Sequence, residues 1–568
     1  MRRTILVSSI TVLSMLAAGS SSAWARDLYV SADAKTNNGQ ADKDKGTQSN
    51  PFGSLAEVEA ASLPGDTIYV LGSKDLLDGG LQLKDGQSLI GQGANVTTAN
   101  EENSSHARLT NSTSAHLNGD AVRLGNNNTV KNIHVTGAWR GGILGFNVTD
   151  AVIDGNLVTN NMNQHTMQEI QTDFIIYQGQ RNHFGAITLF GCGPAASSQC
   201  TIQDPTSPGI TTQHATITNN VIKDVAVEGI IILNDTGIVS TYDLAGNSVD
   251  GVSLHYAGFW RTDLQPPLVP EVIRSRAFTM IAGNEAYAYV NINGFTTTRC
   301  GPEGDFASDS TVFVTFGERA IISCDVRNVH ASNPDFTGEI VNADQLEFTS
   351  FGSDGIFDAR VRDSVFEDSV STNVKLISTG GAQNGGSWLI DIADTKLLNK
   401  NPRCAVEASL GSIGFQKIAA AGALTTENLS VTLHNVTLAG HRRGVFISNL
   451  NSVDMAHLNL FAEDSIFANT TNEGIRIYNQ NGVIENPTID VGGGPLGSQG
   501  RNSFINNGTT PSDAAITIAN DGTPDITVYA SNNYWGGGAP VSGPGEDLYS
   551  TGPVQFVVDG YLKSNPNK

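Results

Sequence analysis

The chain has 568 residues, 16% of them charged, and its formal net charge at pH 7 is −23. Such an acidic chain repels nucleic acids and anionic lipid surfaces, so the composition argues against a nucleic-acid-binding protein. Two or three globular domains would be the usual expectation at this length, but internal repetition takes precedence over that estimate.

The first 25 residues have the three parts of a secretory signal peptide. Arg2 and Arg3 give a positive start, an apolar run follows, and the segment ends in Ala23-Trp24-Ala25, an A-x-A-type cleavage site. The apolar run is shorter than the about 20 residues of a membrane helix, and no later segment has that length and character. We expect cleavage after Ala25 and a mature protein, without a membrane span, that is secreted or periplasmic.

Residues 26–63 form a predicted N-terminal cap. They combine a strand, a polar loop and the helical stretch SLAEVEAAS, in which Ser54 is the expected N-cap and Glu57 completes a capping box. The first coil of a solenoid must be shielded from water and from edge pairing, and a short helix meets that need.

A short phrase recurs between residues 64 and 538: alternating apolar residues, then Asn, Asp or Gly, a small polar residue and another apolar residue. Its clearest copies are AVIDGNLV (151–158), ATITNNVI (215–222), YDLAGNSV (242–249) and TMIAGNEA (279–286), with weaker copies at 359–366, 431–438, 460–467 and 527–534. Period-2 alternation predicts short strands with one buried face, and Asn, Asp or Gly tolerate the left-handed backbone of a tight bend.

These features predict an all-β fold, a single right-handed parallel β-helix whose aligned Asn side chains form a ladder. The 64 residues from Asn156 to Asn220 indicate about three coils of some 21 residues each. An antiparallel sandwich string or a propeller would compete, but no Pro/Ser-rich linker divides the Gly- and Asn-rich texture. Residues 539–568 would close the far end.

Both ends of the chain resemble known β-helix proteins. The run GTQSNPFGSLAEVEAASLPGDTIYVL (46–71) resembles the opening of secreted bacterial pectate-lyase-like proteins. GLQLKDGQSLIGQG (80–93) is similar to β-helix regions of inverse-autotransporter and invasin-like surface proteins, and residues 530–562 are similar to a closing segment found in many such proteins. The resemblance implies the fold over most of the chain and implies little about activity. The barrel and Ig-like modules of the surface adhesins do not occur in this sequence.

Parallel β-helices often act on acidic polysaccharides, yet the site phrases of four such enzyme classes are missing. The chain has no Asp-Asp pair, which polygalacturonases carry, and it lacks the phrases of pectate lyases, pectin methylesterases and mannuronan epimerases. These absences lower the expectation of an enzyme without removing it, because lyase families differ widely.

Two segments, 165–193 and 255–276, interrupt the repeat. We expect them to lie about three coils apart on the same side and to wall a groove. A uronate lyase needs a cation for the carboxylate, a base and an acid. The candidates are Arg261 or Arg181 for the cation, His255 or His183 for the base, and Tyr256 or Tyr177 for the acid. Trp260 could stack on a sugar ring and Arg274 could bind substrate. The alternative is that these are ordinary loop residues.

The five cysteines permit disulfides in an oxidising compartment. Cys192 and Cys200 bracket a short loop and are the first expected pair. Cys300 and Cys324 lie about one coil apart and form the second, which leaves Cys404 unpaired. Pairing cannot be read from sequence alone.

Two charged clusters have both a functional and an ordinary interpretation. The acids of residues 352–369 could bind Ca²⁺ or hydrolyse glycosides, but alternating acids on strands usually form a solvated face. No calcium or zinc motif supports a metal. His441, Arg442 and Arg443 form either a basic spot or a surface turn.

The sequence supports two hypotheses of different classes. In the first, the protein binds or degrades an extracellular or cell-wall polysaccharide and, if it is an enzyme, acts as a polysaccharide lyase or glycoside hydrolase. In the second, it is a non-enzymatic extracellular scaffold or adhesive surface protein. Fold analogy favours the first.

Overall fold

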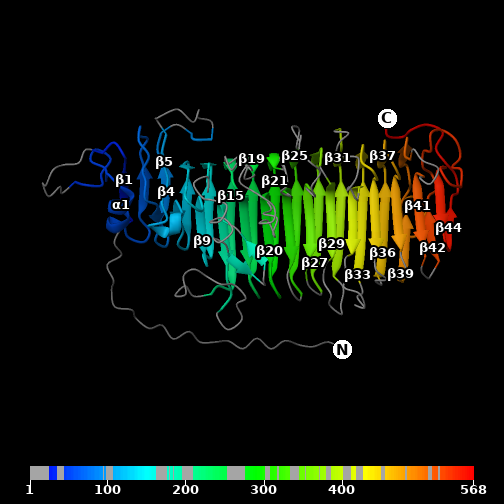
Figure 1. Ribbon diagram of the computed structural model, residues 1–568, viewed down its shortest axis with the longest axis horizontal. Helices are drawn as coiled ribbons and strands as arrows, with labels where there is room; N and C mark the ends of the chain where they lie inside the picture. Colours follow the sequence, from blue (N-terminus) through cyan, green and yellow to red (C-terminus); the bar gives the residue numbers. More distant parts are fainter. Residues whose placement is uncertain are drawn as a thin grey trace, which may run out of the picture.

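The structure is a computed structural model of the whole chain. It describes residues 25–34, 44–93, 95–97, 106–161, 175–177, 180–182, 184–194, 209–252, 275–300, 308–315, 319–332, 344–351, 354–369, 371–378, 386–400, 411–417, 427–449, 455–479, 483–508, 514–521 and 525–568. These residues form a parallel β-helix whose coils stack along one long axis, from α1 (Leu55–Ala61) and β1 at the N-terminal end to β44 at the other (Figure 1). Within them, no helix has the length and apolarity that crossing a membrane requires.

Three long sheets of parallel strands form the faces of the solenoid. The 16-stranded sheet contains β1 (Asp27–Val30), β2 (Thr67–Val70), β4 (Ser88–Gly91), β7 (Asn128–Lys131), β10 (Asp150–Asp154), β15 (Thr212–Thr218), β18 (Val239–Ala245), β21 (Tyr287–Asn293), β24 (Ile321–Arg327), β27 (Ile356–Arg362), β30 (Ser387–Ala393), β33 (Glu427–His434), β36 (Met455–Glu463), β39 (Ile484–Asp490), β42 (Ile526–Tyr529) and β44 (Val554–Val557). The 12-stranded sheet contains β5 (Arg108–Leu109), β8 (His134–Thr136), β11 (Leu157–Thr159), β16 (Val221–Val225), β19 (Ser248–Val252), β22 (Thr296–Cys300), β25 (His330–Ser332), β28 (Val365–Glu367), β31 (Lys396–Leu398), β34 (Thr437–Ala439), β37 (Ile466–Ala468) and β40 (Ser503–Ile505).

The 14-stranded sheet completes each coil and leads to the next strand of the 16-stranded sheet. It contains β3 (Leu81–Gln82), β6 (Val122–Arg123), β9 (Ile143–Phe146), β14 (Gly185–Gly191), β17 (Glu228–Asn234), β20 (Ser275–Ala282), β23 (Ser308–Thr315), β26 (Leu346–Ser350), β29 (Thr372–Ser378), β32 (Gly411–Lys417), β35 (Val445–Asn449), β38 (Ile475–Asn479), β41 (Ile516–Asn520) and β43 (Leu548–Thr551). The predicted N-terminal cap (26–63) and closing segment (539–568) both contribute strands to the solenoid. β1 is the first strand of the 16-stranded sheet and β44 is its last, and both pair in parallel with their neighbours.

The bend from the 16-stranded to the 12-stranded sheet consists of two residues. The residue types at these two positions are those of the phrase that recurs in the sequence. The first residue has a left-handed backbone, with φ of 65° at Gly155, 56° at Asn219 and 51° at Asp363. Gly, Asn and Asp are the residue types that adopt this conformation most readily. Seven of the eight phrases coincide with this bend; the eighth, TMIAGNEA (279–286), lies instead at the connection from β20 to β21.

The second residue of the bend forms the predicted asparagine ladder. The Asn156 side chain donates to Oδ1 of Asn220, and Asn220 donates in turn to Oδ1 of Asn247, both at 3.0 Å. The same position is occupied later by Ser465, Asn502 and Asn533, whose side-chain oxygens accept backbone N–H groups from the preceding coil.

The ladder corrects the predicted spacing. Asn156 and Asn220 lie on adjacent coils, because β10 pairs directly with β15, so the 64 residues between them form one coil rather than three. The extra residues lie in the connections on either side of β14, at 162–184 and 192–211. Loops of this kind lengthen a coil without changing the stacked core.

We expect Asn220→Ala to lower the free energy of unfolding by about 2 kcal/mol, because it removes buried hydrogen bonds and leaves partners unsatisfied. Asn220 is fully buried and also donates to the Ile153 carbonyl at 2.9 Å. Urea denaturation followed by circular dichroism measures the change. The control is Asn291→Ala, since Asn291 makes only a 3.2 Å exposed bond to Asp243. Equal stability of the two variants would contradict the ladder's role.

Apolar side chains that alternate along the strands fill the inside of the solenoid. Aromatic rings stack from coil to coil, with centroids 5.1 Å apart for Phe313 and Phe348 and 4.7 Å for Phe357 and Trp388. At the N-terminal end, α1 places Leu55 and Val58 in the same core. The predicted capping box is present: Ser54 Oγ accepts from the Glu57 N–H, and the Glu57 carboxylate accepts from the Gly53 N–H.

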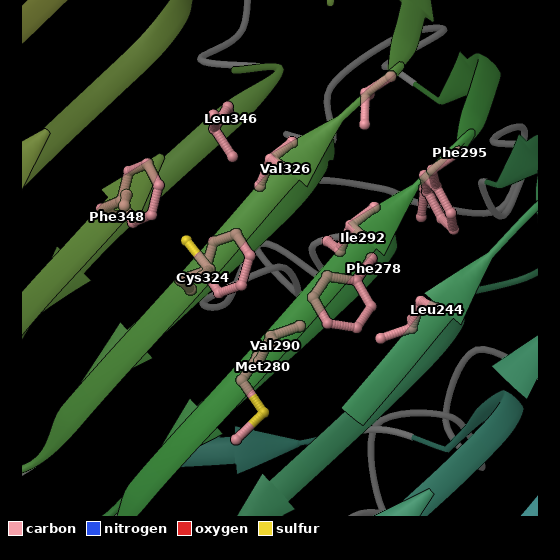
Figure 2. Close-up of a cluster of buried hydrophobic side chains, with 14 of the residues drawn as sticks. Leu244, Phe278, Met280, Val290, Ile292, Phe295, Cys324, Val326, Leu346 and Phe348 are labelled. Atoms are coloured by element: carbon pink, nitrogen blue, oxygen red, sulfur yellow. The ribbon is translucent and has the colours of Figure 1, made fainter. Parts of the chain in front are cut away.

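Cys324 corrects the predicted pairing with Cys300. It is a free, buried cysteine on β24, and Figure 2 shows it among apolar side chains of the core. Cys300 ends β22 in a different sheet, whereas Cys324 is aligned in register with Val290 and Ala359 of the neighbouring coils. Cys192 is disulfide-bonded, and its predicted partner Cys200 lies outside the described residues.

Candidate functional site

Most of the residues predicted for catalysis or substrate binding lie in parts of the chain that the structure does not describe. These are His183, His255, Tyr256, Trp260, Arg261 and Arg274. Tyr177 and Arg181 belong to a short antiparallel pair, β12 (Ile175–Tyr177) and β13 (Gln180–Asn182), in which Tyr177 is opposite Gln180 and Arg181 opposite Ile176. Their assignment to a uronate-lyase site stays a prediction.

The connectivity shows where the two interruptions join the solenoid. One connects β11 to β14 and the other connects β19 to β20, so both lead from the 12-stranded sheet into the 14-stranded sheet. Because β14 and β20 flank β17 on either side, the interruptions enter two coils apart rather than three. The 14-stranded sheet is therefore the face whose strands they adjoin.

The outer face of the 14-stranded sheet carries an unusual sequence of side chains along the axis. Outward-pointing residues at one register position run through Thr188, Ile231, Thr279, Val312, Glu347, Lys375, Gly414, Phe446, Arg476, Thr517 and Tyr549. We call this line the axial row. Neighbouring coils are about 4.8 Å apart, so the row brings residues far apart in sequence into one line.

The first part of the face is apolar. A second hydrophobic cluster, separate from the solenoid core, is formed there by eight buried side chains: Leu144, Phe184, Phe190, Ile231, Leu233, Ile281, Val312 and Val314. Side chains on the outside of a solenoid are normally solvated, so this burial distinguishes the face. The 16-stranded sheet, by contrast, leaves outward apolar side chains such as Val152, Val239 and Tyr287 exposed.

The middle part of the face is buried and charged. Glu228, at the start of β17, accepts a hydrogen bond from Thr279 Oγ1 at 2.9 Å. Four coils further along, on β29, Lys375 Nζ lies 2.6 Å from Asp344 Oδ2 and 3.9 Å from Glu347 Oε2. Burial raises the pKa of Asp344, and the neighbouring Glu347 raises it further, while Lys375 opposes both effects.

The last part of the face combines half-buried aromatic rings with arginines. Phe446, Tyr478 and Tyr549 point outward from β35, β38 and β43. The Arg443 guanidinium lies 4.5 Å from the centroid of Phe446, and that of Arg476 lies 5.7 Å from Tyr478. We call these five residues the aromatic platform.

The arginines of the aromatic platform are held by one buried acid. Glu473 accepts from Arg443 Nε at 2.8 Å and from Arg476 Nη1 at 2.5 Å. This ion triad fixes the two guanidiniums beside the rings. It also corrects the interpretation of His441, Arg442 and Arg443 as a surface turn, because His441 is fully buried and Arg443 is 8% exposed.

Among the residues that the structure describes, three buried polar atoms in or beside the aromatic platform have no hydrogen-bond partner: Ser448 Oγ, Thr517 Oγ1 and Arg476 Nε. Ser448 points outward from β35, the strand that carries Phe446, and Thr517 points outward from β41, which lies between β38 and β43, because their neighbours along the strand point into the core. Buried polar groups are normally paired, so atoms of this kind indicate a place where a polar ligand or water completes the structure.

The acids predicted around residues 352–369 do not form one site. Asp354, Asp363 and Asp368 have left-handed backbones at bends, and Glu367 pairs with Lys400 at 2.7 Å. They are distributed over the bends and faces of neighbouring strands.

His434, Glu463 and Asp464 are close enough to share a metal ion. However, Arg501 already binds both carboxylates, at 3.1 Å for Glu463 and 2.6 Å for Asp464. A cation would have to displace that guanidinium, so the geometry favours an ion-pair network at this position.

Comparisons with known proteins leave the family open. No family model matches the chain, and no curated protein matches it. Among solved structures, a GH136 lacto-N-biosidase from Eubacterium ramulus is similar at 10% sequence identity, with 85% of this chain and 67% of that chain covered and a TM-score of 0.19. A similarity at that TM-score carries no argument about function. The resemblance to pectate-lyase-like and invasin-like proteins stays a prediction.

Proposed function

We propose that the protein binds an extended extracellular polysaccharide along the outer face of the 14-stranded sheet, with the aromatic platform as its main contact. The observation that carries the proposal is the combination of outward, half-buried rings with fixed arginines and unpartnered buried hydroxyls. Aromatic faces bury apolar area while neighbouring polar groups fix orientation, which is the usual make-up of a small-molecule or sugar site.

The position of the platform suits a long ligand. Phe446, Arg476, Thr517 and Tyr549 follow one another on four consecutive coils, so they span about 14 Å along the axis at about 4.8 Å per coil. A chain lying along the axis would meet one side chain of the row per coil. The predicted signal peptide would deliver the protein to the compartment where such polymers occur.

The test is binding to a panel of insoluble and soluble glycans, for example polygalacturonate, alginate, xylan and β-glucan, by affinity electrophoresis and calorimetry. We expect Tyr478→Ala to weaken binding of the recognised polymer about tenfold, equivalent to about 1.4 kcal/mol, because it removes a stacking face. The matched control is Tyr289→Ala, which removes a half-buried outward tyrosine from the 16-stranded sheet.

The two variants separate the outcomes. Unchanged affinity in Tyr478→Ala, or an equal loss in Tyr289→Ala, would place the binding surface elsewhere. If the wild-type protein binds no glycan of the panel or of a glycan array, the proposal fails and the scaffold or adhesive hypothesis takes its place.

A further inference from the structure

The outer face of the 16-stranded sheet carries a line of apolar side chains near one edge. At one register position the line runs through Val239, Tyr287, Ile321 and Ile356, which lie on four consecutive coils. Val239 is 49% exposed and Tyr287 is 40% exposed, and the two isoleucines are half-buried. Adjacent exposed apolar side chains of this kind often mark an interaction surface. We call these four residues the apolar strip.

Charged residues accompany the apolar strip. Glu285 and Arg319 lie at the bends just before β21 and β24 and pair with each other, although their side chains are 55% and 65% exposed. On the sheet itself, Asp243 of β18 and Arg360 of β27 are exposed at a second register position. Arg360 makes no ion pair within the part of the chain that the structure describes. Asp243 and Arg360 are three coils apart, about 14 Å, so they do not contact each other within one chain.

We propose that two copies of this chain associate face to face through the 16-stranded sheet, about a two-fold axis that runs parallel to the strands and passes between β21 and β24. Rotation about this axis reverses the order of the coils and keeps the direction of the strands. Each strand therefore faces the strand that lies equally far from the axis on the other side: β21 faces β24 of the second copy, and β18 faces β27. Such a contact is isologous, because both copies use the same surface.

The rotation places the apolar strip against itself. Tyr287 meets Ile321 of the second copy, and Val239 meets Ile356 of the second copy, so all four apolar side chains lose water together. The symmetry leaves no freedom to slide along the strands, because a two-fold axis parallel to the strands keeps each residue at its own height. The strip can therefore only meet the strip, and its exposure in a single copy is explained by this contact.

The charges of the face are complementary under the same rotation. Asp243 lies opposite Arg360 of the second copy, and Glu285 lies opposite Arg319, and each of these pairs occurs twice. Over the eight strands from β10 to β33, no outward side chain faces a like charge. An axis through β24 would instead place Asp325 opposite itself. Complementary charges select one register of association and disfavour the others.

The face is large enough for a stable contact. Strands of seven residues span about 20 Å and eight coils span about 38 Å, which gives a footprint of about 750 Å² on each copy. A standard interface buries about 800 Å² on each partner. The inference does not depend on glycan binding, because the 14-stranded sheet lies outside this contact.

The test is the molar mass of the full chain, measured by sedimentation equilibrium up to about 100 μM. We expect a dimer. Asp243→Arg and Arg360→Asp should each raise its dissociation constant at least about tenfold, because each places like charges opposite each other twice. The double variant exchanges the two charges and should recover most of the wild-type affinity. Two residues that are not in contact within one chain would not rescue each other unless they meet across the interface.

The apolar strip is tested with a pair of tyrosine variants. Tyr287→Ser should raise the dissociation constant about tenfold, because it removes an apolar side chain next to the axis. Tyr69→Ser, at a half-buried outward position of β2 outside the contact, should leave it unchanged. Melting temperature reports whether each variant folds. A wild type that stays monomeric over the whole concentration range, a dimer that the single charge variants do not weaken, or a double variant without recovery would each overturn the proposal.

Discussion

Replacing Arg140 with Met is expected to lower the free energy of unfolding by about 3–5 kcal/mol, because it leaves a buried carboxylate without its main partner. Arg140 and Asp120 are both fully buried, and the guanidinium donates through Nε at 2.7 Å and Nη2 at 2.6 Å. The Phe184 ring lies 4.1 Å from the same guanidinium. After substitution, Asp120 keeps only Arg123, at 2.8 Å, as a charged partner.

Urea denaturation at neutral pH measures this loss, and an exposed ion pair provides the comparison. Arg327→Met breaks the bond of Arg327 to Asp325, in which the arginine side chain is 52% exposed, and should lower the free energy of unfolding far less than Arg140→Met does. A second comparison is Arg140→Met combined with Asp120→Leu, which removes both charges and should recover part of the loss. Should Arg140→Met cost no more than Arg327→Met, the buried pair would not stabilise the start of the 14-stranded sheet.

The fold could be predicted because the sequence pattern that specifies each strand and bend lies within a few consecutive residues. Each strand alternates in sequence, and each bend after the 16-stranded sheet needs a residue that tolerates positive φ followed by one that reaches the ladder. Asn219 and Asn220 satisfy the two requirements side by side. The length of each coil could not be predicted in the same way, because an insertion changes the number of residues in a coil without changing the sequence at its bends. The coil between Asn156 and Asn220 is an example.

The candidate site depends on information that is not local. Glu347 and Lys375 look like ordinary outward residues of alternating strands, and only the register of β26 against β29 brings them together. The same holds for Phe446 and Tyr478, whose strands give no indication of which of the three sheets they join. Sequence reasoning instead favoured the interruptions, where catalytic residue types are concentrated. A more useful indication of the site would be a charged or aromatic residue at an outward position of an alternating strand. That strand would also have to belong to the sheet into which the insertions lead.

Two buried histidines make the fold sensitive to acid. His441 is fully buried and neither ring nitrogen has a partner, so burial lowers its pKa to about 3. His134 is 4% exposed and lies 3.2 Å from His106 and 3.0 Å from Thr159 Oγ1. Burial, with a contribution from His106, likewise lowers the pKa of His134 to about 3. Both side chains are therefore neutral in the folded protein.

The sign of the pH dependence follows from these lowered pKa values. An unfolded histidine takes up a proton below about pH 6.5, whereas these two stay neutral in the fold until about pH 3. The unfolded state therefore binds more protons in this window, and stability falls as pH decreases through it. At pH 4.5 each histidine lowers the free energy of unfolding by about 2.7 kcal/mol relative to pH 7.5, and the two together lower it by about 5 kcal/mol.

Substituting His441 with Leu should remove about half of this acid sensitivity. At pH 7.5 the variant should be as stable as the wild type or slightly more stable, because an apolar side chain replaces an unpaired polar one of similar size. Urea denaturation at pH 7.5 and at pH 4.5 gives the two free energies. His457→Leu, at an exposed position of β36, is the matched control and should leave the difference between the two pH values unchanged. If His441→Leu loses as much stability on acidification as the wild type does, the histidine is charged or solvated in the folded protein and the acid sensitivity arises elsewhere.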